Sequence, residues 1–267
     1  MKKQMKKTSY FLLLKLTIIL CVMGTAPSSQ GAEIRISYFN SIPHVYLDKD
    51  TGQLKGAVYD LLEKHIAGRM NVKFRWDSEP SGIARQLKNL GDGERDAMAL
   101  LAYLPERARD YEYSSKPYFK AQPALLFRQG SQSALKTISK IEDILHLKIG
   151  FAKNTYLSEF MRDSRIKWDM VGHPDFILAN IERLMLGRLD AVYSPDSTGL
   201  LYGIRKMNFE KEMLLVPLPE KLVEFYVTFS KHCKNHAENF NRAFDAAEGA
   251  KLYLEILKQY IDMPEVK

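Results

Sequence analysis

From Glu33 onward, short apolar runs alternate with longer segments in which apolar residues recur at helical spacing. In the segment 57–70, apolar residues three or four positions apart from Val58 to Ile66 would share one helix face. The first round predicts strands and helices in the order Glu33–Tyr38 (strand), Ala57–Met70 (helix), Val72–Trp76 (strand), Gly82–Leu90 (helix), Asp96–Leu101 (strand) and, after a loop, the extended apolar segment Ala121–Arg128.

The alternation then starts again. The second round predicts Ile141–Leu145 (helix), Leu147–Phe151 (strand), Thr155–Arg162 (helix), Trp168–Gly172 (strand), Asp175–Leu186 (helix), Ala191–Ser194 (strand), Gly199–Lys206 (helix), the strands Met213–Pro217 and Glu224–Ser230, and two closing helices, Ala237–Ala247 and Lys251–Ile261. Two successive rounds favour two α/β units over one large sheet. Ligands of such sheets bind outside the carboxyl ends of the strands, so two facing units would share one site.

The N-terminus has the layout of a secretory signal peptide. Four lysines lie among the first seven residues, an apolar stretch follows from Phe11 to Met23 with only Lys15 interrupting it, and small or turn-forming residues run from Gly24 to Ala32. The apolar stretch is shorter than the roughly 20 residues that a membrane-spanning helix needs. We therefore expect residues 1–32 to be a cleaved signal peptide and the mature chain to be periplasmic, with the exact cleavage site left open.

Removal of residues 1–32 changes the charge balance. The whole chain carries a net charge of +7, but this segment contributes five lysines and no acidic residue, which leaves only +2 for the rest. The basic character therefore gives no reason to expect a nucleic-acid partner. The mature chain keeps a single cysteine, Cys233, so burial of apolar side chains and not an internal disulfide must stabilise it.

Four segments together resemble the family 3 extracellular solute-binding proteins, the polar amino-acid binding class of ATP-driven importers. The opening of that family resembles residues 41–66, SIPHVYLDKDTGQLKGAVYDLLEKHI, in which Asp50, Gly52, Leu54 and Gly56 form its "D-x-x-G-x-L-x-G" turn. Its next signature resembles residues 91–119, with "P-E-R" at Pro105, Glu106 and Arg107 and "S-x-P-Y" ending at Pro117 and Tyr118. The start of the second lobe resembles residues 141–156, and the return to the first lobe resembles residues 224–260.

The resemblance covers nearly the whole mature chain and implies a periplasmic-binding-protein-like type II fold, with two α/β lobes joined by two hinge crossings. Lobe 1 would contain residues 33–124 and 219–267, and lobe 2 would contain residues 125–218. The implied function is capture of a small carboxylate-bearing ligand, amino-acid-like or an aromatic acid, for import by an ABC transporter. Two alternatives stay open: a freestanding ligand sensor or chemoreceptor partner of the same fold, and an enzyme similar to cyclohexadienyl dehydratases.

The resemblance assigns the ligand's carboxylate to Arg107, and a planar guanidinium suits this role because it offers parallel N–H donors to two oxygens. The alternative is a structural arginine paired with Glu106. The family's carboxylate-binding Thr is replaced by Ala102, and its helix-start loop in lobe 2 corresponds to Ala152, Lys153 and Asn154, with Thr155 next. Backbone N–H groups at such a helix start bind anions, so we expect Lys153, Asn154 and Thr155 in the site.

The residues that hold an amino-acid ammonium in the family are altered. The lobe 2 acid falls on Pro195, with Asp196 one residue later, and the lobe 1 acid is replaced by Tyr38. An α-amino acid would lack its usual counter-charge unless Asp196 moves into place, which leaves a carboxylate without an amine as a candidate ligand. We expect Tyr38 and Tyr103 to offer aromatic faces to the ligand, because both lie at or beside carboxyl ends of lobe 1 strands.

We expect no catalytic residues, no metal and no cofactor, because neither a catalytic constellation nor a metal-ligand spacing is apparent. His232 and His236 are spaced for a metal only if they lie on one helix, and we interpret them as a surface pair. The predicted partners are a small-molecule ligand and either an ABC permease of the inner membrane or a membrane sensor. We expect a monomer.

Overall fold

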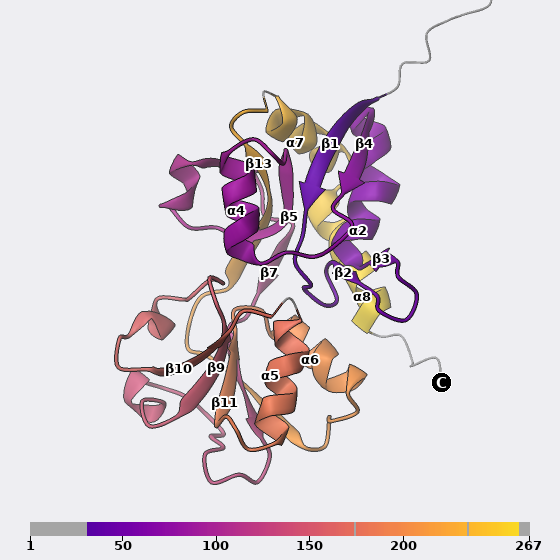
Figure 1. Ribbon diagram of the computed structural model, residues 1–267. Helices are drawn as coiled ribbons and strands as arrows, with labels where there is room; N and C mark the ends of the chain where they lie inside the picture. Colours follow the sequence, from indigo (N-terminus) through magenta and orange to yellow (C-terminus); the bar gives the residue numbers. More distant parts are fainter. Residues whose placement is uncertain (1–30, 174, 234, 262–267) are drawn as a thin grey trace, which may run out of the picture. The chain divides into compact units, whose positions relative to one another are not determined.

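The computed structural model describes residues 31–173, 175–233 and 235–261, and these residues form two β-sheets with separate helices around each (Figure 1). The predicted signal peptide lies almost entirely outside the described residues. None of the helices in the described part of the chain has the length and apolar character to cross a membrane.

Lobe 1 is the sheet with strand order β4-β1-β5-β13-β6, in which β7 also pairs with β13, together with its helices. Its strands are β1 (Ala32–Ser37), β4 (Val72–Trp76), β5 (Ala97–Ala102), β6 (Tyr111–Tyr113), β7 (Phe119–Ala121) and β13 (Val223–Ser230). Its helices are α2 (Ala57–Asp60), α3 (Ala67–Met70), α4 (Ile83–Gly91), α7 (His236–Ala246) and α8 (Gly249–Ile261), with a π-helical stretch at Leu61–Ile66 and a 3₁₀ turn at Arg107–Arg109. A small hairpin, β2 (Tyr46–Leu47) and β3 (Leu54–Lys55), follows β1.

Lobe 2 is the sheet with strand order β10-β9-β11-β8-β12 together with its helices. Its elements are β8 (Ala124–Arg128), β9 (Lys148–Ala152), β10 (Lys167–Val171), α5 (Phe176–Met185), β11 (Ala191–Ser194), α6 (Ser197–Lys206) and β12 (Met213–Pro217), with 3₁₀ turns at Ile141–Asp143 and Phe160–Arg162. Strands β9, β10 and β11 are parallel, and β8 and β12 are antiparallel to their neighbours.

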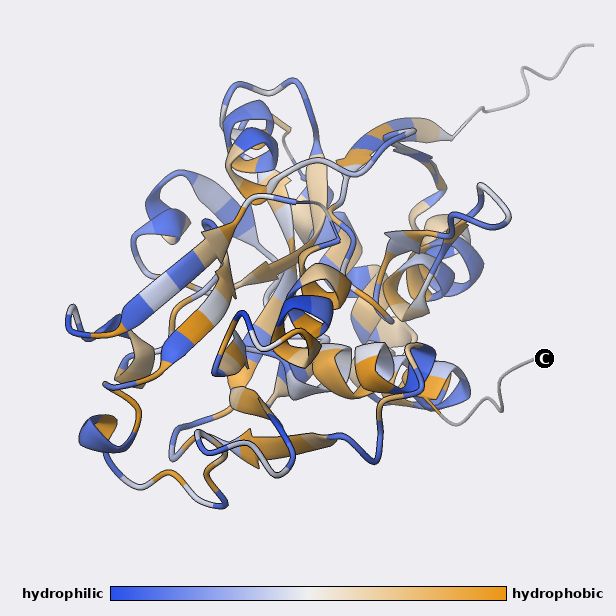
Figure 2. Cartoon of the chain, turned by 60° about the horizontal axis from the view of Figure 1, so that its bottom comes forward, coloured by the Kyte–Doolittle hydropathy of each residue, from blue (hydrophilic) through white to orange (hydrophobic). Residues whose placement is uncertain are grey.

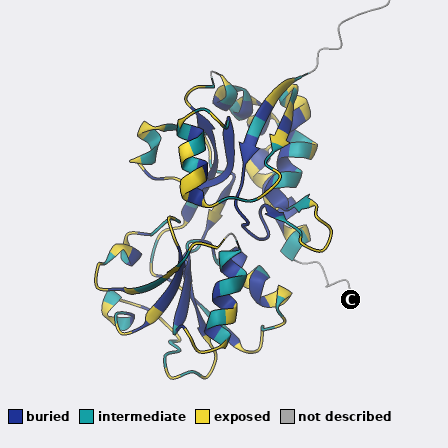
Figure 3. Cartoon of the chain, in the orientation of Figure 1, coloured by how far each residue is buried: buried dark blue, intermediate teal, exposed yellow. Residues whose placement is uncertain are grey.

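Each lobe has its own apolar core. The central strands are buried in both sheets, and exposed residues lie on helices, in loops and on the outer strands (Figure 3). In β8, Leu125 and Phe127 pack into one cluster and Leu126 into another on the opposite face. Burial on both faces explains why these strands are continuous apolar runs, as the hydropathy colouring of the central strands also shows (Figure 2).

The chain crosses between the two sheets twice. The strands of lobe 2 come from residues 124–217, and those of lobe 1 come from residues 32–121 and 223–230. The predicted extended segment Ala121–Arg128 is therefore two strands, because β7 belongs to one sheet and β8 to the other. The crossings lie side by side: the Gln122 side chain donates to the Leu218 carbonyl at 2.9 Å, and Leu218 N–H donates to Pro123 O at 2.9 Å.

One predicted helix is wrong. Of the segment Thr155–Arg162, only Phe160–Arg162 is helical, as a single 3₁₀ turn. Asn154 has a left-handed backbone with φ of 65°, and both the N–H and the hydroxyl of Thr155 donate back to Ala152 O, at 3.3 and 2.8 Å. This turn closes on the end of β9 and prevents a helix from starting at Thr155.

Candidate functional site

A cavity lies where the two sheets reverse their strand order. In lobe 1 the chain passes from β1 to β4 on one side and then to β5 on the other, and in lobe 2 it passes from β9 to β10 and then to β11. Such switch points leave a crevice at the carboxyl ends of the strands. The cavity encloses about 50 Å³ and is lined from both lobes by Phe39, Ser41, Ile83, Leu100, Leu101, Ala102, Arg107, Asn154, Thr155, Tyr156, Phe176, Ile177, Ser194, Pro195 and Asp196.

Arg107 lines the cavity from the loop that follows β5. It begins a 3₁₀ turn five residues after Ala102, which ends the strand and also lines the cavity. Burial lowers the pKa of the Arg107 guanidinium, and the neighbouring Tyr113 hydroxyl and Glu106 act in the opposite direction. Among the described residues no carboxylate lies within ion-pair distance of Arg107, and Glu106 instead lies 3.9 Å from Arg162 of lobe 2.

The two tyrosines expected in the site lie elsewhere. Tyr38 is only 1% exposed and packs edge-on against Trp76 inside lobe 1, with no part in lining the cavity. Tyr103 is 43% exposed and packs edge-on against Tyr113 and at a tilt against Tyr226, with ring centroids 5.1 and 6.0 Å apart. The aromatic rings that do line the cavity belong to Phe39, Tyr156 and Phe176.

The expected anion site at a helix start in lobe 2 is absent from the described residues, because no helix begins at Thr155. Asn154 and Thr155 nevertheless line the cavity as members of the turn after β9. Lys153 lines a smaller adjoining cavity that shares Phe39, Ile83, Thr155 and Phe176 with the first and also contains His173. Lys153, Asn154 and Thr155 are thus at the cavities as predicted, but they form a turn and not the start of a helix.

Asp196 lines the cavity, but its carboxylate is engaged inside the protein. Oδ1 accepts from Thr198 N–H at 2.9 Å and Oδ2 from Gly199 N–H at 3.2 Å, which makes Asp196 the N-cap of α6. Oδ2 also lies 2.7 Å from Nε2 of His44, a lobe 1 residue that is 1% exposed. The other ring nitrogen of His44 hydrogen-bonds the Tyr253 hydroxyl. The His44 ring thus links the Asp196 carboxylate and the Tyr253 hydroxyl through its two nitrogens.

The loop after β1 forms further contacts between the lobes. The Asn40 amide donates to Asp175, and Lys49 Nζ lies 2.6 Å from the other oxygen of that carboxylate. Ile42 and Tyr46 of the same loop pack into a lobe 2 core cluster. The loop therefore closes one side of the cavity and joins lobe 1 to helices α5 and α6.

Sequence reasoning missed several lining residues, notably Ser41, Phe176 and Ser194. Ser194 ends β11 and Phe176 begins the helix after β10. Their position after predicted lobe 2 strands was the available signal, because carboxyl ends of strands face the site in open α/β sheets. Ser41 lies in an irregular loop and had no comparable signal.

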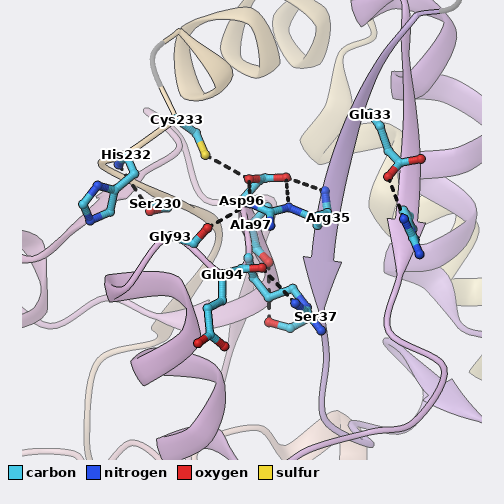
Figure 4. Close-up of polar contacts among 12 residues, drawn as sticks. Glu33, Arg35, Ser37, Gly93, Glu94, Asp96, Ala97, Ser230, His232 and Cys233 are labelled. Carbon is cyan, nitrogen blue, oxygen red and sulfur yellow. Dashed lines mark hydrogen bonds and ion pairs between the residues drawn. The ribbon is translucent and has the colours of Figure 1, made fainter.

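A second polar cluster lies in lobe 1 around the start of β5, and none of its members lines the cavity (Figure 4). Asp96 accepts from Arg35 Nε and a terminal guanidinium nitrogen at 3.0 and 2.7 Å, and from the Cys233 thiol at 3.0 Å. Burial and this hydrogen bond to Asp96 raise the pKa of the Cys233 thiol to about 12. His232 bonds the Gly91 carbonyl at 2.9 Å. The described residues contain no group of three or more potential metal ligands.

Known structures share this architecture. An ancestral arginine-binding protein bound to arginine is 22% identical, with a TM-score of 0.71 over 86% of this chain and 99% of its own. The amino acid ABC transporter substrate-binding protein AbpA from Streptococcus pneumoniae, bound to L-arginine, is 16% identical, with a TM-score of 0.70 over 88% and 96%. A histidine kinase sensor domain with similarity to periplasmic binding proteins is 16% identical, with a TM-score of 0.72 over 87% and 97%.

The chain thus has the two-lobed periplasmic-binding-protein-like type II fold, and the predicted fold class is confirmed. Neither a protein-family model nor a curated protein sequence matches the chain. At these identities the likeness concerns the fold.

Proposed function

We propose that this chain is an exported solute-binding protein whose two lobes hold a small ligand by its carboxylate, against Arg107. The observation that carries the proposal is a partly buried guanidinium on the wall of the cavity between the lobes, with no carboxylate partner among the described residues. Desolvation of a cation is costly unless an anion pairs with it. A ligand carboxylate would supply that anion in the fork geometry that a guanidinium favours.

The cavity walls and its size define how such a ligand would bind. Most of the lining side chains are apolar, and the hydroxyls of Ser41, Thr155 and Ser194 add a few polar groups, as is usual in small-molecule sites. A volume of about 50 Å³ is much smaller than a ligand pocket of roughly 300 Å³ or more. We therefore expect the lobes to part about the two crossings before a ligand enters, and to close around it.

Import by an ABC transporter is the role we propose, and a freestanding sensor role is the second candidate. AbpA, a transporter component, and a histidine kinase sensor domain match the fold about equally well, with TM-scores of 0.70 and 0.72. Uptake of the bound acid by cells with and without this chain separates the two roles. Loss of uptake supports import, whereas unchanged uptake with a lost response to the acid supports sensing.

We further propose that the cavity has no catalytic activity. Among the described residues, Asp196 is the one carboxylate on the cavity wall, and two backbone N–H groups and His44 hold it, so it is not free to assist an elimination. Incubation with prephenate or arogenate should therefore give no product, and measurable turnover would establish the dehydratase alternative.

Export rests on the N-terminal pattern of lysines, apolar residues and small residues. N-terminal sequencing of protein from the periplasmic fraction should find a first residue between positions 27 and 33. A cytoplasmic protein that keeps Met1 contradicts this proposal.

The central experiment compares Arg107→Ala with Arg109→Ala. A thermal-shift screen of the purified chain against amino acids and aliphatic and aromatic carboxylates identifies binders, since ligand binding raises stability by mass action. Loss of one partner of a buried, hydrogen-bonded charge pair costs about 2–5 kcal/mol, so Arg107→Ala should weaken binding by at least about thirtyfold. Arg107→Lys should recover only part of the affinity, because an ammonium lacks the planar fork.

Arg109 is the matched control, because it is exposed on the same 3₁₀ turn and does not line the cavity. Arg109→Ala should bind as the wild type does. Unchanged affinity in a folded Arg107→Ala protein would contradict the proposed role of Arg107.

A further inference from the structure

The described part of the cavity wall contains one acidic side chain, Asp196, and internal contacts occupy it. Both Asp196 oxygens accept backbone N–H groups of the first turn of α6, and Oδ2 also faces His44 Nε2 at 2.7 Å. The Asp196 side chain is about 10% exposed and the His44 side chain about 1%. A ligand ammonium could use this carboxylate only by displacing His44, which would leave a buried ring nitrogen without its partner.

Asp175 and Glu220 do not line the cavity. Asp175 is bound by Asn40 and by Lys49, whose Nζ lies 2.6 Å from its second oxygen. Glu220 accepts from Phe160 N–H at 2.7 Å through Oε1, and its buried Oε2 has no hydrogen-bond partner among the described residues. The adjoining cavity adds Lys153 and His173 and no acidic residue.

We propose that this cavity selects carboxylates that have an apolar body and no ammonium group, such as short branched-chain or aryl-substituted alkanoates. The inference rests on the proposed function, because Arg107 supplies the charge that holds the carboxylate. It adds that the site rejects α-amino acids: the ligand's carboxylate pairs with Arg107, and the one carboxylate on the described wall, Asp196, is already bound by His44 and two backbone N–H groups.

The apolar part of the wall fits the rest of such a ligand. Phe39, Phe176 and Tyr156 provide aromatic surface, and Ile83 and Leu101 provide aliphatic surface. An alkyl or aryl chain gains from burial against these side chains. An ammonium at the α-carbon would instead lose its hydration beside a guanidinium of like charge.

The test uses matched pairs of ligands that differ only by the α-ammonium. The pairs are 3-methylbutanoate and L-valine, 4-methylpentanoate and L-leucine, and 3-phenylpropanoate and L-phenylalanine, with L-arginine and 2-phenylethylamine as cationic comparisons. Dissociation constants are measured by calorimetry on the purified chain and on Arg107→Ala. Because an unpaired buried charge costs several kcal/mol, we expect the acid of a binding pair to bind on the order of 100-fold more tightly than its amino acid.

The outcomes separate this inference from the proposed function. Tight binding of an acid, loss of that binding in Arg107→Ala and weak binding of its amino acid support both. Equal or tighter binding of the amino acid, still dependent on Arg107, overturns the selectivity and leaves the proposed function intact. Binding of neither the acids nor the amino acids, or binding that Arg107→Ala does not affect, overturns the proposed function and the selectivity together.

Discussion

Replacement of Asp196 by Ala tests whether this carboxylate serves the fold or the ligand. The substitution removes the N-cap of α6, which stabilises a helix by about 1 kcal/mol. It also leaves Nε2 of the buried His44 without its acceptor, at a cost of about 1–3 kcal/mol. We therefore expect the free energy of unfolding to fall by about 2–4 kcal/mol in the absence of any ligand, equivalent to a melting temperature roughly 5–15 °C lower.

Urea denaturation followed by circular dichroism measures this change at pH 7 without added ligand. Asp196→Asn should lose less stability than Asp196→Ala, because its amide oxygen still accepts from the α6 backbone. Ser197→Ala is the matched control: it changes the next residue, whose side chain forms no hydrogen bond with other described residues, and should cost less than about 0.5 kcal/mol. An Asp196→Ala protein as stable as Ser197→Ala would refute the structural role of Asp196 and favour a role in ligand binding.

Two further predictions concern lobe 1. Gly56→Ala should lower the free energy of unfolding, measured by urea denaturation, by about 3 kcal/mol or more, because φ is +126° there and an added Cβ would lie 2.3 Å from His44 O. Gly68→Ala is the control: it lies in α3 with open space around it and should be neutral or stabilising. Equal effects of the two substitutions would contradict the argument. Burial acts to raise the pKa of Asp96, but hydrogen bonds, chiefly from Arg35, outweigh it and lower the pKa to about 2. The resulting stabilisation, about 2 kcal/mol, should be present above pH 4 and lost as the pH falls to 2. Urea denaturation across this range should show a smaller pH dependence of the unfolding free energy in Asp96→Asn than in the wild type. The same pH dependence in both proteins would disprove the role of Asp96.

The pattern of apolar and polar residues is enough to predict the order and type of most elements. Strands β4, β11 and β12 have the predicted bounds, α4 and α5 differ from the predictions by one residue at each end, and α6 begins two residues earlier than predicted. These elements are predictable because local periodicity records which side chains they bury. Arg107 was singled out because its motif resembles that of the family 3 extracellular solute-binding proteins, and it does line the cavity, five residues after the end of β5.

The roles of the two tyrosines could not be predicted in the same way. At the end of β1, Tyr38 points into the lobe core while Phe39 lines the cavity. In a strand with one wet face, alternating hydrophobicity would show which neighbour faces inward. From Ile36 in β1 to Phe39, two residues past its end, all residues are buried, so the sequence pattern does not record which side chain faces the cavity.

Whether Asp196 contacts a ligand or caps a helix depends on contacts that form only in the folded protein. Its sequence position, just after β11, fits a ligand contact and a helix cap equally well. The contact that engages the carboxylate comes from His44, 152 residues earlier in the chain, and the ring of His44 is oriented by Tyr253 from the last described helix. Local periodicity records burial along one segment. The contact between Asp196, His44 and Tyr253 forms only where three distant segments pack together. The sequence alone therefore could not show that the Asp196 carboxylate is already bound inside the protein.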